Sequence, residues 1–345
     1  MSAQKGSRAR SVVTTLAKLG VAFGLIYWLW RRGAIDFGKV GDTVRDPAWL
    51  LQCSGLCLAG MVIITIRWLL LLRLEGIDLS ILAALKLTFV GQFWNSVLPG
   101  AVTGDVVKMY YIGKKSPDKK AEAYATVMID RVIGLAALVY LAFFAALLNK
   151  DFVFAPGHEK LKLTFYGNAL AAAGFTVGIL ALVLGVGRKS SFADRIRGSR
   201  LPGIEHFRRG YRTLIRLGER PGILVASFAL GVFSHSLLVI MGIISARALG
   251  EQRIETSTYG FVVPVGLFVN SIPVGLPGGL GVGEEAFKKL FEWAGGGVTV
   301  GATVMLLMRI AQTAWALVGG VIYVFDRAAL APKEEEAAGE ALPVS

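Results

Sequence analysis

Six long apolar segments constrain this chain more than any other feature. Each is long enough to cross a bilayer, which takes about 20 mostly apolar residues in a helix. The composition agrees, with 54% hydrophobic and 18% charged residues against about 25% charged in soluble domains. The sequence therefore predicts an all-α polytopic membrane protein. The predicted spans are Val12–Trp30, Trp49–Leu72, Ala121–Leu148, Leu163–Gly187, Ile223–Leu249 and Val298–Phe325.

The first apolar segment also resembles a signal peptide, because it follows Lys5, Arg8 and Arg10. Its length, its Trp28-Leu-Trp-Arg-Arg32 end and the lack of a small-residue cleavage site favour an uncleaved anchor. We expect a tail at 1–11, a single membrane domain at 12–325 and a disordered tail at 326–345.

Loop charge predicts the orientation. If the six spans alternate, 20 Lys and Arg residues lie on the side of the two termini and 8 on the other side. The positive-inside rule then places both termini in the cytoplasm, for a protein of the inner membrane. The loop 31–48 goes against this rule, because its four basic residues are expected outside.

Two further apolar stretches, 79–113 and 259–293, are broken near the middle by proline and glycine. In the alternation above, each returns to the side on which it began. We therefore predict two re-entrant hairpins, the first entering from the cytoplasm and the second from outside. Irregular backbone at membrane depth survives only where protein or a water-filled cavity surrounds it, so the hairpin tips should mark the interior.

The two broken stretches resemble each other. The first reads Phe93-Trp-Asn-Ser-Val-Leu-Pro-Gly-Ala-Val-Thr-Gly-Asp105, and the second reads Phe268-Val-Asn-Ser-Ile-Pro-Val-Gly-Leu-Pro-Gly-Gly-Leu-Gly-Val-Gly-Glu284. An arginine follows each one in the next span, at Arg131 and Arg309. The pattern predicts an inverted repeat, and interrupted segments at matching positions of such repeats indicate a transport site near the midplane.

Asp105 and Glu284 follow the two hairpin tips, where an unpaired carboxylate would cost about 2.5–3.5 kcal/mol or more. Arg131 and Arg309 are the expected partners. The four side chains would form either a lipid-phosphate or proton site, or two structural ion pairs that hold the hairpins. Arg67 and Arg247 lie near span ends, where we expect them to reach toward water.

Asn95 and Asn270 have amides that can satisfy backbone groups freed at the hairpin breaks. Helix N-termini after the glycine-rich tips could present N–H groups to an anion. No nucleotide-binding loop is expected, because Gly279-Leu-Gly281 lacks a preceding strand. Cys53 and Cys57 are expected to pack inertly and His235 to bond between helices, so neither a metal nor a cofactor is expected.

The loop 188–220 carries a net charge of +7. Apolar residues recur in it at helical spacing from Ile204 to Ile215, which predicts an amphipathic helix on the surface of an anionic membrane. A basic topology determinant remains the alternative, and nucleic-acid binding is not expected. The arginines expected to contact the membrane are Arg208, Arg209, Arg212 and Arg216.

These motifs resemble the flippase-like transmembrane family of lysylphosphatidylglycerol synthases. The resemblance covers about 49–325 and is carried by Leu98-Pro-Gly100, Gly104-Asp105, Asp130-Arg131 and Pro277-Gly-Gly-Leu-Gly281 with Glu284. It implies a lipid translocator with re-entrant helices. The chain departs from the family pattern at Thr103, Lys108 and Gly283, so headgroup selectivity could differ. We expect a stand-alone member without the synthase domain, and therefore not an enzyme.

The sequence thus predicts a translocator that moves a lipid with an anionic or phosphate headgroup between leaflets, either an anionic phospholipid or a polyprenyl phosphate. Two alternatives stay open: a secondary transporter of a small soluble anion, and a non-transporting partner of a lipid-modifying or glycosyl-transferring enzyme. Homo-oligomer formation is also open. The candidate headgroup or ion site comprises Asn95, Pro99, Gly104, Asp105, Lys108, Arg131, Asn270, Pro277, Gly278, Gly279, Gly281, Glu284 and Arg309.

Overall fold

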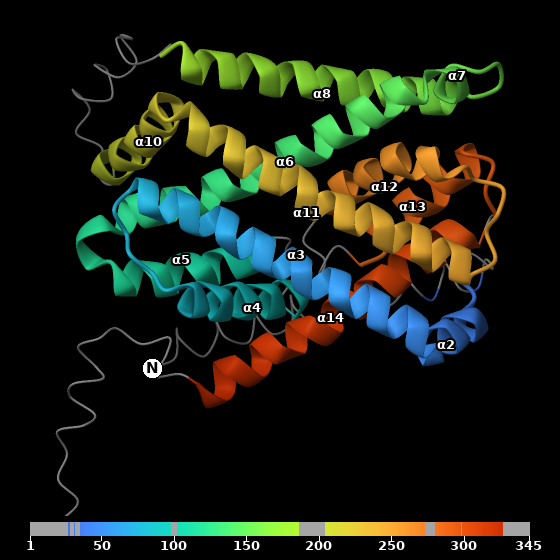
Figure 1. Ribbon diagram of the computed structural model, residues 1–345, viewed down its shortest axis with the longest axis horizontal. Helices are drawn as coiled ribbons and strands as arrows, with labels where there is room; N and C mark the ends of the chain where they lie inside the picture. The colour runs from blue at the N-terminus through green and yellow to red at the C-terminus, as the bar shows by residue number, and fades with distance from the viewer. Residues whose placement is uncertain are drawn as a thin grey trace, which may run out of the picture.

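The computed structural model describes residues 35–97, 102–185, 204–272, 280–297 and 299–326, together with Tyr27 and Arg31. Within these ranges the chain is helical, with no strand (Figure 1). The expected first span, the two proline–glycine turns and the C-terminal tail lie outside the described residues.

Five described helices are long and apolar enough to cross a membrane. A helix of 25 residues is about 38 Å long, more than the hydrocarbon thickness of about 30 Å. They confirm five of the six expected segments and define a multi-pass membrane protein. The five helices are α3 (Pro47–Leu74), α6 (Lys120–Leu148), α8 (Glu159–Val183), α11 (Pro221–Ala248) and α14 (Val300–Phe325).

Two pairs of shorter helices occupy the broken stretches. The first pair is α4 (Ile81–Val97) and α5 (Thr103–Lys115), and the second is α12 (Thr256–Asn270) and α13 (Val282–Trp293). The helices of each pair pack against each other. Figure 1 shows the two pairs at opposite ends of the bundle, each reaching toward its middle.

The two halves of the chain exchange packing partners. The helix α6, which follows the first pair, packs against α12 of the second pair as well as against α5. The helix α14, which follows the second pair, packs against α4 of the first pair as well as against α13. The helices that precede the two pairs, α3 and α11, pack on each other. The contacts of the two halves are thus reciprocal, as in a two-fold structural repeat.

The loops gather at two ends, as the alternation of spans predicts. At one end Lys119 Nζ donates to the carbonyls of Glu75 and Gly76. At the other end Asn149, after α6, donates to Thr258 at the start of α12. The structure therefore separates the loop 75–80 and the turn 116–119 from the loops that follow α6 and precede α12. Which end faces the cytoplasm remains a prediction.

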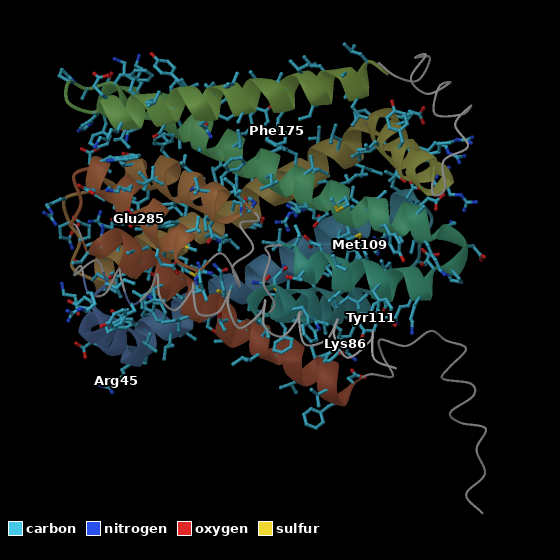
Figure 2. The ribbon with its side chains drawn as sticks, turned by 180° about the vertical axis from the view of Figure 1, so that it is seen from behind. Arg45, Lys86, Met109, Tyr111, Phe175 and Glu285 are labelled. Carbon is cyan, nitrogen blue, oxygen red and sulfur yellow. The ribbon has the colours of Figure 1, made fainter. Side chains whose placement is uncertain are left out.

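Three short elements cap these ends: α2 (Phe37–Arg45), α7 (Lys150–Val153) and the 3₁₀ turn Pro117–Lys119. An ion pair between Lys86 of α4 and Asp326 holds the end of α14 against α4. Figure 2 labels Lys86 near that end of α14.

The basic amphipathic segment forms helix α10 (Ile204–Glu219). Thr213 and Leu217 of this helix are buried, because it packs on α6 and α8. Arg216 pairs with Glu75 at the end of α3, and Arg209 donates to the carbonyl of Asp118. Part of its basic face therefore binds protein, and membrane contact by Arg208, Arg209, Arg212 and Arg216 stays a prediction.

Glycine allows α14 to approach α4 closely. A Cβ atom on Gly319 would overlap the backbone carbonyl of Phe89. Because backbone cannot rotate aside as a flexible side chain does, a larger residue here would push the two helices apart. On the peripheral helix α8, a Cβ atom on Gly174 would meet nothing within 4 Å.

We expect Gly319→Ala to lower the stability of the detergent-solubilised protein by about 1–3 kcal/mol, the usual cost of overpacking. Gly174→Ala serves as the matched control and should leave stability unchanged or slightly raised, because alanine favours helix. Thermal unfolding of the two variants measures the difference. Equal midpoints would contradict the close approach of α4 and α14.

Candidate functional site

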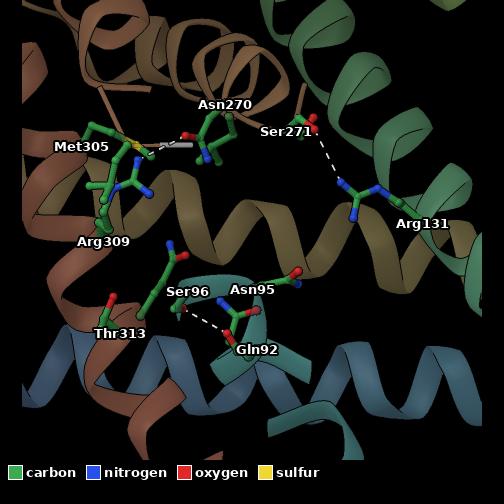
Figure 3. Close-up of a pocket in the computed structure, with 12 residues that line it drawn as sticks. Gln92, Asn95, Ser96, Arg131, Asn270, Ser271, Met305, Arg309 and Thr313 are labelled. Carbon is green, nitrogen blue, oxygen red and sulfur yellow. Dashed lines mark hydrogen bonds between the residues drawn. The ribbon is translucent and has the colours of Figure 1, made fainter. Parts of the chain in front are cut away.

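A polar cavity of about 370 Å³ lies where the two short helix pairs meet. Figure 3 shows its walls, with Arg131 on one side and Arg309 on the other. Three apolar residues, Leu267, Leu280 and Met305, complete the lining. The polar residues that line it come from four helices: Gln92, Asn95, Ser96, Arg131, Asn270, Ser271, Arg309, Gln312 and Thr313.

Arg131 connects the two halves of the chain. Its Nη1 donates to Oδ2 of Asp105 on α5, and the two side chains are 21% and 18% exposed. Its Nη2 lies 3.5 Å from the carbonyl oxygen of Ser271 at the end of α12. The expected pair with Asp105 is therefore present, and the same guanidinium also reaches the second helix pair.

Arg309 holds the second pair of short helices together. Its Nε donates to Oε1 of Glu284 at 2.8 Å, and its Nη2 donates to Asn270 Oδ1 at 3.2 Å. Oε2 of Glu284 in turn accepts the backbone N–H of Gly281 at 2.7 Å. Gly281 has a φ of 84°, a conformation that glycine adopts without strain. One arginine thus links α14 with the end of α12 and the start of α13.

The two asparagines act at the same place in each half. Asn95 Oδ1 accepts the backbone N–H of Gly104 at 2.7 Å and so caps α5, which confirms the expected capping role. Asn270 Oδ1 instead accepts from Arg309. The N–H groups of Gly104 and Gly281 are bound by side chains, so the helix starts are partly satisfied within the protein.

Glycines allow the short helices to approach each other. Sequence reasoning missed two of these glycines, Gly91 and Gly266. A Cβ atom on Gly104 would overlap the carbonyl of Gly91 on α4, and one on Gly266 would overlap the ring of Phe287 on α13. Gly91 and Gly266 each precede the asparagine of their half by four residues. That shared Gly-x-x-x-Asn spacing was the available signal.

Sequence reasoning also missed the polar neighbours of the predicted residues. Gln92 and Ser96 flank Asn95 on one helical face, and Gln312 and Thr313 follow Arg309 at spacings of three and four. Such spacings place side chains on a common face of a helix. Polar residues at these spacings within apolar segments were the signal for the cavity wall.

The carboxylates do not line the cavity. Asp105 and Glu284 lie behind the guanidinium groups, and the Glu284 side chain is fully buried. The cavity therefore meets guanidinium, amide and hydroxyl groups, all of which can donate hydrogen bonds. A guanidinium matches the oxygens of phosphate or carboxylate in two parallel bonds. Chemically, this arrangement is suited to binding an anion.

A third, drier ion pair corrects one expectation. Arg67 was expected to reach toward water, but its side chain is 6% exposed and binds Asp130 in two bonds, of 2.6 and 3.1 Å. The expectation failed because Arg67 faces α6, where a carboxylate lies opposite. Arg247 does bind at a span end, to carbonyls of Glu251 and Ile254.

Three other residues that the sequence analysis singled out are Lys108, His235 and Cys57. Lys108 is buried with its Nζ 4.0 Å from the centre of the Trp68 ring, and it does not line the cavity. His235 bonds through Nε2 to the carbonyl of Gly134, as expected for an interhelical contact. Cys57 packs against Met241. The predicted Pro99, Pro277, Gly278 and Gly279 lie outside the described residues.

The ion pairs near the cavity are balanced within themselves. The Arg67–Asp130, Arg131–Asp105 and Arg309–Glu284 pairs are each neutral. Lys108 lies in the field of Asp130, Asp105 and Arg67, and its burial makes its charged form costly.

The fold and the cavity define a helical multi-pass membrane protein with two arginines that line one interior cavity. The family of the lysylphosphatidylglycerol synthase TM region matches residues 15–320, and the chain belongs to this family. It is similar to a UPF0104 membrane protein of Methanothermobacter thermautotrophicus, with 24% identity over 79% of this chain and 84% of that protein.

A second relative is a UPF0104 membrane protein of Pyrococcus horikoshii. It is 25% identical over 90% of this chain and 96% of its own length. No solved structure matches the chain. The likeness to both relatives therefore extends over most of the chain, with no additional catalytic domain shown in it.

We expect Arg67→Leu to destabilise the protein by about 3–5 kcal/mol, because it leaves Asp130 buried without its partner. Arg131→Leu should cost less, because the Asp105 side chain is 18% exposed, against 9% for Asp130. Thermal unfolding of the solubilised variants measures both effects. The double variant Arg67→Leu/Asp130→Leu removes both charges and should recover much of the loss. A double variant no more stable than Arg67→Leu would contradict this account.

Proposed function

We propose that this protein translocates a lipid with a phosphate headgroup between the two leaflets. The carrying observation is the placement of Arg131 and Arg309, which face one cavity from opposite sides while their carboxylate partners lie behind them. A headgroup phosphate bound there would contact both halves of the inverted repeat. The hydrocarbon chains would remain in apolar surroundings.

The chemistry of the cavity wall supports a phosphate ligand. A phosphate presents several oxygens, enough for two guanidinium groups and the surrounding amides at once. Gln92, Asn95 and Asn270 supply those amides.

The architecture that we propose has six spans and two re-entrant hairpins. The helix pairs α4/α5 and α12/α13 would each enter and leave at the same face. The Asn95–Gly104 bond joins α4 to α5, and the bonds from Arg309 to Asn270 and Glu284 join α12 to α13, which supports such hairpins. Inverted repeats of this type place the substrate between them and allow access to alternate between the two faces.

The location that we propose is the inner membrane, with both termini in the cytoplasm. The end that carries α10, the turn 116–119 and the loop 75–80 would face the cytoplasm, because the basic residues concentrate there. Lipids are thus the expected partners, whether an anionic phospholipid or a polyprenyl phosphate. Membership of a family defined on a lipid-synthase membrane region supports lipid as the ligand class.

Reconstituted vesicles test the proposal. Purified protein is placed in phosphatidylcholine vesicles with fluorescent phosphatidylglycerol, with and without a pH gradient, and dithionite bleaches the label in the outer leaflet. We expect faster bleaching of inner-leaflet label than in protein-free vesicles. Arg131→Gln and Arg309→Gln should each slow it about tenfold, because a charge-assisted hydrogen bond contributes about 1.5–3 kcal/mol.

Arg73→Gln is the matched control, because Arg73 is an exposed arginine at the end of α3 and should transport at the wild-type rate. Equal rates for all variants would contradict a site at Arg131 and Arg309. Efflux of trapped inorganic phosphate without any lipid movement would instead establish a transporter of soluble anions. A protein that moves neither would favour the non-transporting alternative.

A further inference from the structure

A second hollow lies beside the polar cavity, between α8 and the α12/α13 pair. It is an open groove of about 560 Å³, and most of its lining is apolar. Val265 and Val269 of α12, Val282 and Ala286 of α13 and Thr164 of α8 form its walls. Figure 2, which shows the molecule from behind, labels Glu285 on this face of α13 below α8.

The groove and the cavity share a wall that is one chain thick. Val269 lines the groove, and the next residue, Asn270, lines the cavity. Likewise Gly281 lines the groove, and Leu280 lines the cavity. The groove therefore ends at the place where Arg309, Glu284 and Asn270 meet.

The other end of the groove has the character of a membrane interface. Trp293 and Lys289 of α13 line it there, and Lys160 of α8 places its Nζ 5.7 Å from the centre of the Trp293 ring. Tryptophan is enriched at the level of lipid headgroups, and lysine near a helix end extends its amine toward that level. The Lys289 amine lies 3.9 Å from the carboxylate of Glu292, so the two amines and this carboxylate leave one positive charge to complement a headgroup phosphate.

The length of the groove fits one leaflet. The helix α13 has 12 residues and is therefore about 18 Å long. Half of the hydrocarbon core is about 15 Å. A lipid with its phosphate near Lys160 and Lys289 would thus extend its chain along α13 to Gly281.

One carboxyl group interrupts this apolar lining. Glu285 Oε2 is buried without a hydrogen-bond partner, but Lys288 Nζ lies 3.8 Å from it, one helical turn along α13. The pair is neutral in sum, so the groove keeps its apolar character. Its net charge is then set by Lys160, Lys289 and Glu292 at the interface end.

We propose that this groove binds one hydrocarbon chain of an anionic phospholipid in the leaflet at this end. The inference rests on the proposed function and specifies it: the lipid is first held by its chain in the groove, with its phosphate near Lys160 and Lys289, and its headgroup then moves to the site at Arg309. One chain of the substrate is thus bound by protein, and the thin wall at Val269–Asn270 and Leu280–Gly281 separates it from the headgroup site.

Photochemical labelling tests the groove without any transport measurement. The full-length protein is reconstituted in phosphatidylcholine vesicles that contain traces of phosphatidylglycerol with a diazirine along one chain, and the labelled residues are mapped by mass spectrometry. We expect label to concentrate on Val265, Val282 and Ala286. Label spread evenly over exposed apolar residues of α8, such as Leu170 and Val177, would overturn the proposal.

A matched pair of variants supplies the second arm. Ala286→Trp fills the groove and should reduce labelling there severalfold. Val106→Trp is the control, because Val106 lies on α5 of the first helix pair, directly after Asp105, and is 55% exposed. Thermal unfolding verifies that both variants fold. If Ala286→Trp does not fold, the labelling map of the wild-type protein decides whether the groove binds a lipid chain.

The labelling and transport results fail independently. An unlabelled groove together with slow transport in Arg309→Gln would overturn the groove and leave the proposed function standing. A labelled groove with undiminished transport in Arg131→Gln and Arg309→Gln would overturn the proposed function and leave the groove standing. Equal labelling by phosphatidylcholine carrying the same diazirine would overturn the role of the two lysine amines in selecting an anionic lipid.

Discussion

Two guanidinium–carboxylate pairs at the breaks in the short helices are the interactions on which the rest of the site depends. Each arginine lies on a long helix, and each carboxylate lies in the first turn of a short helix. Without these pairs the charges of Asp105 and Glu284 would have no counter-ion at membrane depth, where burying a charge costs free energy. Because the carboxylates lie behind the arginines, the opposite side of each guanidinium is turned toward the cavity. The same pairs that join the helices thus direct two guanidinium groups toward one cavity.

The exchange of packing partners between the halves explains why the cavity belongs to both. The helix α6 packs on α12 and α14 packs on α4, so a shift of one helix pair would move the arginine that faces the other. Glycines such as Gly319 and Gly104 make the close approaches possible. A ligand that binds Arg131 and Arg309 together would therefore favour one arrangement of the two halves, as alternating access requires.

Much of this site could be predicted from the sequence, because the internal repeat places the same residue types at matching positions in both halves. The matched Asn–Ser motifs and the following arginines predicted the Asp105–Arg131 and Glu284–Arg309 pairs. The Arg67–Asp130 pair could not be predicted in this way, since it has no counterpart in the second half and depends on how α3 is rotated toward α6. The groove also escaped prediction, because it depends on where α8 docks, and an apolar helix face alone does not specify its neighbour.

Native mass spectrometry of the protein with phosphatidylglycerol tests the central claim most directly, namely that both arginines hold one anion. The measurement uses Ala286→Trp as the background, so that the groove is filled, and this variant should retain one tightly bound lipid per chain. Adding Arg131→Gln or Arg309→Gln alone should abolish that bound state, and adding both should lose no further lipid. Two tightly bound lipids in the Ala286→Trp background, with one retained after each single arginine substitution, would show two separate sites and contradict the account.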